Sequence, residues 1–295
     1  MEHSLQRFLE AKRSVDDRAH NHQVWESLKT ALIGVGGLQP LEVLEINGGV
    51  GGMFHRILAD GVLSRAAYTL IDPEPDNIAH ALAHLPEQLE GLGQETAGRP
   101  GGLFVFSPVV AVDAVLEAVD LEVFIEREAG NRQWDLIIVN TAFDLIHTDF
   151  ALAELCSLAY PGALIYFATN PEGWMAFEPQ LDPLVDDFIS TCYYQRAQNN
   201  WMGRGLFKKL DDAGLSLLDV GGMDWIVFPK RGEYPSDEGY FLHYMLDKVG
   251  KDLLGCSELD QSRLAAWLAA RHAQVERGEL VFVSHQLDFL AQVAS

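Results

Sequence analysis

The sequence predicts a doubly wound α/β fold, in which a mostly parallel sheet carries helices on both faces. Short apolar runs typical of buried strands alternate with segments of helical spacing from about residue 41 to residue 168. The first of these runs ends in a glycine-rich turn, NGGVGG at 47–52, and the second ends at Asp72, about 20 residues after that turn. With 295 residues, of which 48% are hydrophobic, the chain can bury a large core, and we expect a single domain over 1–295.

The N-terminal half of the pattern begins with helices. Apolar residues recur at helical spacing within 1–34, interrupted near 16–21, which predicts an N-terminal helical segment of two helices joined by a polar elbow. LEVLEI (41–46) is a strand, and a helix follows over 52–59. AYTLID (67–72) is the second strand, leading to a helix from about 75 to 85.

The middle of the chain supplies three more strands. We expect a surface loop over 87–102 and a third strand at GLFVFS (102–107). WDLIIVN (134–140) is a buried strand, and ALIYFA (163–168) follows the next helix. The strand and helix alternation then stops near residue 170.

Two insertions separate the remaining strands. Residues 171–202 have no strand pattern and are predicted to form a helical cap insertion. LSLLDVGGMDWIVFP (215–229) supplies the sixth strand, residues 236–278 form a helical insertion, and LVFVSHQLDFL (280–290) closes a seven-stranded sheet.

Charge and composition limit the classes of partner. Forty-three acidic and 21 basic residues give a formal charge of −22, which opposes binding to nucleic acid or to an anionic membrane surface. No apolar stretch reaches the length of a membrane span, so a cytoplasmic location is expected. The three cysteines, Cys156, Cys192 and Cys256, are scattered singly, and no metal site is predicted.

The ends of the first two strands are the predicted ligand site, because ligands of open α/β sheets bind beyond the carboxyl ends of the strands. Glycines allow the sharp turn after the first strand and let a ligand approach backbone N–H groups. Asp72 can accept the hydroxyls of a ribose, although it could instead cap the helix that follows.

The runs VLEINGGVGGM, TLID and WDLIIVN, in this order, resemble the class I S-adenosylmethionine-dependent methyltransferases over about 41–228. SVDDRAHN, GMDWIVFP with YPSDEGYF, and RHAQVERGELVFVSHQLDFL look like a bacterial and archaeal subgroup of that family. The resemblance implies a Rossmann-like seven-stranded fold, S-adenosylmethionine as cofactor, S-adenosylhomocysteine as product, and in-line transfer of a methyl group to a small molecule.

The resemblance also implies roles for individual residues. Glu45 and Gly49 would border the methionine part of the cofactor, Asp72 would hold its ribose, and Asp113 would accept from its adenine. Asn140 would lie near the transferred methyl group, or would simply form a turn. Asp113 could equally be a helix cap. The remaining expected cofactor contacts are Asn47, Gly48, Gly51, Pro73 and Ala114, of which Asn47 departs from the small or apolar residue that is more usual there.

Candidates for chemistry on the acceptor are less specific. Asp144 and His147 follow the WDLIIVN strand, and His147 is a candidate base, although both could merely decorate the next helix. Arg18 could bind a carboxylate of cofactor or substrate, or could pair with Asp16 or Asp17. In the cap, Tyr193, Tyr194 and Trp201 are candidates for contact with substrate.

Two other functions remain open. A nicotinamide-dependent oxidoreductase would prefer the spacing G-x-G-x-x-G, and no glycine stands three residues after Gly51. A catalytically silent, methyltransferase-like protein that binds a partner is the other possibility. The sequence is compatible with a monomer or a homodimer.

Overall fold

The structure, a computed structural model, describes residues 4–35, 39–140, 149–168, 175–197 and 202–294. The chain forms two compact units, each assembled from segments that are distant in sequence. The sheet unit comprises Asn21–Asn170, Gly205–Gly221 and Asp288–Ser295, and the helical unit comprises Met1–His20, Pro171–Arg204 and Gly222–Leu287.

Five parallel strands form the centre of the sheet unit in the order β5-β2-β1-β6-β7. Their bounds are β1 Leu41–Ile46, β2 Arg65–Asp72, β5 Ala111–Ala118, β6 Trp134–Asn140 and β7 Ala159–Ala168. The chain first adds β2 and β5 on one side of β1 and then crosses to β6 and β7 on the other side. The strand order therefore reverses between β1 and β6, which confirms the predicted doubly wound sheet.

Antiparallel strands lie at both sides of this parallel centre. β10 (Val281–Gln292) runs antiparallel to β7, with Asp288 opposite Ala168, and β9 (Ser216–Val227) pairs with β10. On the other side, β3 (Glu95–Arg99) and β4 (Gly102–Phe106) form a hairpin that pairs antiparallel with β5. The sheet has ten strands in the described part of the chain, where the sequence predicts seven.

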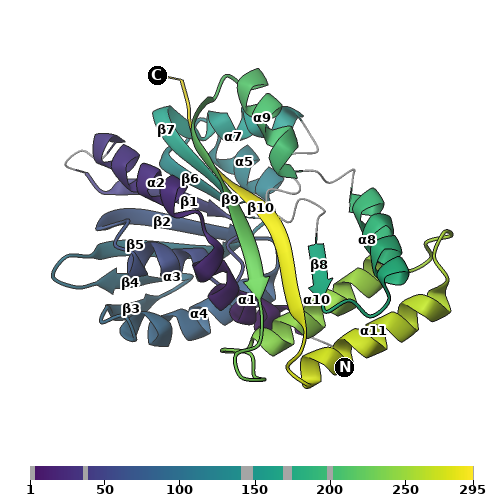
Figure 1. Ribbon diagram of the computed structural model, residues 1–295. Helices are drawn as coiled ribbons and strands as arrows, with labels where there is room; N and C mark the ends of the chain where they lie inside the picture. The colour runs from purple at the N-terminus through teal and green to yellow at the C-terminus, as the bar shows by residue number, and fades with distance from the viewer. Residues whose placement is uncertain (1–3, 36–38, 141–148, 169–174, 198–201, 295) are drawn as a thin grey trace. The chain divides into compact units, whose positions relative to one another are not determined.

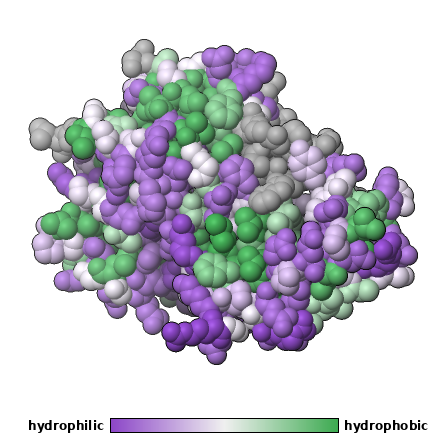
Figure 2. Space-filling view, viewed as in Figure 1, coloured by the Kyte–Doolittle hydropathy of each residue, from purple (hydrophilic) through white to green (hydrophobic). Residues whose placement is uncertain are grey.

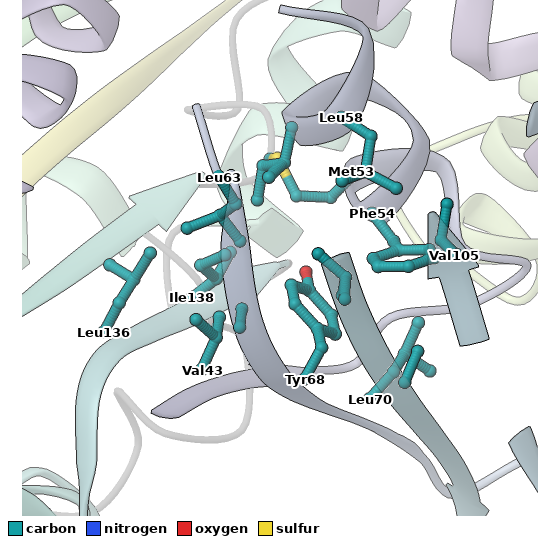
Figure 3. Packing of buried hydrophobic residues seen from close by; sticks show 14 of the residues in the cluster. Val43, Met53, Phe54, Leu58, Leu63, Tyr68, Leu70, Val105, Leu136 and Ile138 are labelled. Carbon is teal, nitrogen blue, oxygen red and sulfur yellow. The ribbon is translucent and has the colours of Figure 1, made fainter. Parts of the chain in front are cut away.

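Helices cover both faces of the parallel strands. α2 (His22–Val35), α3 (Gly52–Ala59) and α4 (Pro75–Glu90) share one apolar core with every second residue of the strands. Figure 3 shows strand residues such as Val43, Leu70 and Ile138 within this core, which α3 also enters. α5 (Leu121–Glu128) and α7 (Asp149–Ser157) connect strands in the opposite direction across the sheet, so right-handed crossovers place them on the other face (Figure 1).

The helical unit has a core of its own. It contains α1 (Leu5–Ala19), α8 (Pro183–Ala197), α10 (Glu238–Leu253), α11 (Gln261–Glu276) and the short strand β8 (Met175–Glu178), which pairs with Val281–Ser284 of β10. α9 (Met202–Asp212) leads back towards β9. Around Phe241, the rings of Phe8, Trp225 and Phe282 lie at centroid distances of 5.5, 5.4 and 6.1 Å, so aromatic packing holds α1, α10 and the strands together.

Three sequence-based expectations are corrected here. The segment over 102–107 is not a third parallel strand but the antiparallel β4, and the parallel place beside β2 belongs to β5. The expected surface loop over 87–102 contains the end of α4 and all of β3. The cap at 171–202 includes the strand β8 beside the helix α8. The strands β3 and β8 were missed because they are short and partly exposed, which weakens the apolar pattern.

On the face shown in Figure 2, hydrophilic residues predominate and hydrophobic residues form smaller groups. None of the helices in the described ranges combines the length and the hydropathy that crossing a membrane requires.

Candidate functional site

The carboxyl ends of β1, β2 and β6 meet at one edge of the sheet, where the strand order reverses. Ile46 is opposite both Ile71 of β2 and Val139 of β6, so the residues that follow these positions come together. The side chains that the strands deliver to this edge are Glu45, Asp72 and Asn140. Such a reversal point is where doubly wound sheets bind ligands.

The turn between β1 and α3 depends on left-handed backbone conformations. Asn47, Gly49 and Gly51 have φ angles of 54°, 55° and 84°. Asn is the non-glycine residue best suited to such a conformation, so Asn47 supports the turn, although a small or apolar residue was the more usual expectation there. Gly51 is the N-cap residue of α3, and its N–H donates to the carbonyl of Gly48 at 2.9 Å.

Close packing is a second reason for glycine in this turn. A Cβ on Gly48 would lie 2.3 Å from Cγ of Leu70, and one on Gly51 would lie 2.8 Å from Cδ1 of Leu85. Both distances are below any real carbon contact, so side chains at 48 and 51 would displace the apolar core beneath the turn. Two of the three expected cofactor glycines, Gly48 and Gly51, are therefore also required by packing.

Asp72 ties the turn to the following helix. It is 5% exposed, and its Oδ2 accepts from the N–H of Gly49 at 2.8 Å, while Oδ1 accepts from the N–H of Glu74 at 3.0 Å and from Asn77 Nδ2 at 2.9 Å. Pro73, between Asp72 and the N-cap residue Glu74, is exposed. The sequence did not identify Asn77 as a partner of Asp72, because this contact becomes apparent only once α4 is positioned beside the end of β2.

Glu45 is the centre of a buried polar group. Its side chain is fully buried, Oε2 accepts from the Tyr68 hydroxyl at 2.7 Å, and Oε1 accepts from Asn140 Nδ2 at 2.7 Å. Figure 3 shows the Tyr68 hydroxyl among apolar side chains that include Phe54 and Ile138. The sequence analysis did not identify Tyr68, although it stands four residues before Asp72 and so lies on the same face of β2.

The protonation of this group is shifted by its surroundings. Burial raises the pKa of Glu45 to about 7, against the opposing effect of the hydrogen bonds from Tyr68 and Asn140. That value includes a smaller upward effect of the nearby Asp72 carboxylate and a smaller downward effect of Arg56. Burial and the Glu45 carboxylate raise the pKa of Tyr68 well above its ordinary value. A carboxyl that exchanges its proton near neutral pH therefore lies at this edge of the sheet.

Asp113 and Ala114 do not lie at this edge. Both are near the start of β5, with Asp113 opposite Ala67, and Asp113 pairs with Arg99 at 2.6 Å. The acid that follows β5 is Asp120, the exposed N-cap residue of α5, whose side chain makes no capping hydrogen bond. Asp113 was expected to follow the third strand because that strand was placed at 102–107, whereas AVDAVLEA, with its alternating burial, is itself a strand.

Arg18 belongs to the helical unit. Its Nη1 and Nη2 donate to Oε1 and Oε2 of the fully buried Glu238 at 2.5 and 3.0 Å, and Ser14 Oγ donates to Oε1 at 2.9 Å. Neither sequence-based alternative anticipated this partner. Contact of Arg18 with cofactor or substrate stays a prediction.

The other expected catalytic and substrate residues are divided between the described and undescribed parts of the chain. Asp144, His147 and Trp201 lie outside the described residues. Tyr193 and Tyr194 are on α8 in the helical unit, and burial, aided by Asp252, raises the pKa of Tyr193. No cluster of three or more potential metal ligands occurs among the residues described.

Comparison with known proteins finds structural similarity but no sequence relative. No protein-family model and no curated protein matches the chain. It is similar to S-adenosylmethionine-dependent methyltransferases crystallised with S-adenosylhomocysteine from Geobacter sulfurreducens (15% identity, TM-score 0.45, covering 94% of this chain and 96% of that one) and Thiobacillus denitrificans (14%, 0.41, 93% and 96%). It is also similar to a phosphoethanolamine N-methyltransferase 2 from Haemonchus contortus (12%, 0.42), of which the alignment spans 58% while covering 99% of this chain.

Proposed function

We propose that this chain is an S-adenosylmethionine-dependent methyltransferase that acts on a small molecule. The observation that carries the proposal is the grouping of Glu45, Asp72, Asn140 and the left-handed turn at the reversal point of a doubly wound sheet. The motif order VLEINGGVGGM, TLID and WDLIIVN, on which the family resemblance rests, falls on the three strands that build this edge.

The donor and acceptor groups present fit this cofactor. A carboxylate has about four acceptor sites, and Asp72 uses three for the protein's own N–H groups, which leaves capacity for a ribose hydroxyl. The exposed Asp120 follows the third parallel strand and takes over the adenine-binding role first expected of Asp113.

Charge favours this cofactor over a dinucleotide. Glu45 and Asp72 place two carboxyls near the turn, a setting suited to a ligand that carries a sulfonium and an ammonium group rather than a pyrophosphate. The sheet agrees, because a dinucleotide fold repeats two parallel βαβαβ halves, whereas here the antiparallel β10 takes the sixth place.

When bound, the cofactor supplies a methyl group on a sulfonium, an electrophile that needs no further activation. The protein's task is then to position the reactants in line and exclude water. Asn140 Nδ2 is held by Glu45, which fixes the amide and leaves its carbonyl oxygen as an acceptor at the strand end. Asp144 and His147 remain candidates for contact with the acceptor.

Isothermal titration with S-adenosylmethionine, S-adenosylhomocysteine and NAD tests the proposal. We expect micromolar binding of the first two, weakened about tenfold or more by Asp72→Asn, because a charge-assisted hydrogen bond becomes a neutral one. Asp76→Asn is the matched control, since it removes an exposed acid from the first turn of α4 and should leave binding unchanged.

Other results would redirect the assignment. Binding of NAD alone would indicate the oxidoreductase. If the protein has a native circular dichroism spectrum but binds none of the three, the silent partner-binding protein is favoured. In that case Asp72 and Glu45 would be retained only for their hydrogen bonds within the fold. Size-exclusion chromatography with light scattering would distinguish monomer from homodimer.

A further inference from the structure

The helical unit contains a cavity of about 1000 Å³. Its walls come from β8, α8, α11 and the parts of β9 and β10 that belong to this unit (Figure 1). Its lining combines apolar side chains, among them Ala176 and Leu287, with charged and hydroxyl side chains. A volume of this size admits a small organic molecule.

A buried network fixes one wall of the cavity. Asp186 accepts from Trp267 Nε1 and from Arg271 Nη2, each at 2.5 Å, and from the N–H of Leu181 at 2.8 Å. Arg271 is fully buried and also donates to the carbonyl of Pro179 at 2.7 Å. Burial would raise the pKa of Asp186, but the hydrogen bonds from Trp267 and Arg271 outweigh it and hold the pKa below its ordinary value. Arg271 and Asp186 therefore neutralise each other, and this wall is preorganised.

An oriented histidine also lines the cavity. His285 Nδ1 lies 2.6 Å from Asp224 Oδ1, and a Cβ on Gly222 would come within 3.3 Å of His285 Cε1. With Nδ1–H directed at the carboxylate, Nε2 is the nitrogen that carries the lone pair. His285 can therefore accept a hydrogen bond from a molecule in the cavity.

The remaining charge at the cavity is negative. Glu178 and Asp187 also line it, and no Lys or Arg within the described ranges pairs with either. With Arg271 matched by Asp186, a neutral His285 leaves Asp224, Glu178 and Asp187 as uncompensated acids. This combination of acids, an oriented acceptor and an apolar wall suits an organic cation with N–H donors.

We propose that this cavity binds a small molecule with an ammonium group attached to an apolar body. The ammonium donates to His285 Nε2 and lies within the field of Asp224, Asp187 and Glu178, while the body packs against Ala176 and Leu287, which share a face of the β8–β10 ladder with His285. None of its lining residues belongs to the sheet unit, so its test does not depend on the proposed methyl transfer.

Isothermal titration of the whole protein with three matched probes tests the proposal. 2-Phenylethylamine, 2-phenylethanol and 3-phenylpropionate present a cation, a neutral hydroxyl and an anion on similar bodies. We expect the amine to bind at least about tenfold more tightly than the alcohol, and the carboxylate not to bind measurably.

Variants place the binding at this cavity. Asp224→Asn, at a half-exposed position compatible with folding, should weaken amine binding about tenfold by removing both a charge and the partner that orients His285. Glu276→Gln removes an exposed acid of α11 that does not line the cavity and should change binding less than twofold, about the effect expected of a distant screened charge. Equal affinity for amine and alcohol, no amine binding, or an unchanged affinity in Asp224→Asn would each overturn the proposal. A failure of the protein to bind S-adenosylmethionine would not overturn this proposal, so the failures of the two proposals are distinguishable.

Discussion

Replacing Glu45 by glutamine removes the buried titratable charge at the candidate site while keeping its shape. A glutamine at this position can accept from Asn140 Nδ2 through its carbonyl and donate through its amide to the Tyr68 oxygen, because the hydroxyl can turn to serve as acceptor. The substitution therefore exchanges a group that ionises near pH 7 for one that never ionises, with both hydrogen bonds retained.

The magnitude follows from the pKa of Glu45, which is 4.5 as an ordinary value and about 7 in the folded protein. Below the ordinary value the group is protonated in both states and carries no penalty. As the pH rises towards 7 the unfolded chain ionises first, so the folded state loses stability. Above the folded pKa the loss is complete and amounts to about 3 kcal/mol.

Urea unfolding of the wild type and Glu45→Gln measures this directly. The free energy of unfolding of the variant, relative to wild type, should rise by about 2 to 3 kcal/mol between about pH 5 and about pH 8. Glu42→Gln is the control on the same strand, because Glu42 is 33% exposed and paired with Arg132. A difference that stays constant with pH, or falls, would refute the assignment of a raised pKa to Glu45.

Other substitutions test the surrounding structure. Arg18→Met leaves the carboxylate of Glu238 buried without its cation and should lower the free energy of unfolding by about 2 kcal/mol. Adding Glu238→Gln to this variant should partly restore the stability. If urea titrations showed that the losses of the two single variants simply add, the coupling of Arg18 and Glu238 would be contradicted. Gly51→Ala should lower the free energy of unfolding by at least about 1 kcal/mol more than Gly61→Ala does. Both glycines have a positive φ, but only at position 51 would the new Cβ collide with a neighbour, Leu85. Equal melting temperatures of the two variants would be evidence against that contact. Tyr68→Phe removes a donor to Glu45 and should raise its folded pKa further, so the pH-dependent loss of stability should begin at the same pH but become larger and extend to higher pH, as the same unfolding titrations would show.

The parallel centre of the fold was predictable because its strands are buried on both faces. LEVLEI and WDLIIVN are nearly continuous apolar runs, since Val43, Leu44, Ile137 and Ile138 are each fully buried. The peripheral strands lack that signal. β3, for example, has the sequence ETAGR and is largely exposed, so only its pairing with β4 identifies it as a strand.

The site was predictable where a residue's role follows from its place in the chain. Glu45, Asp72 and Asn140 stand at strand ends, and the structure brings them to one edge. Tyr68 and Asn77 join them through side chains that reach from neighbouring elements, and such contacts depend on the register of β2 and the placement of α4. The same limit applies to Arg18, whose partner Glu238 lies far along the chain.

The buried Glu45 is itself a reason to regard this edge as functional. A glutamine would make the same hydrogen bonds without the loss of stability above neutral pH, so packing alone does not explain an acid at this position. Proteins tolerate such costs where a charge is useful to a ligand.

If the proposed cofactor binds beside Glu45, its sulfonium favours the ionised carboxylate, and binding near pH 7 should release up to about half a proton. S-Adenosylhomocysteine lacks the sulfonium and should release less, and Glu45→Gln should abolish the difference. Titration in buffers of different ionisation enthalpy measures this release, and equal release for both ligands would show that Glu45 serves the fold alone.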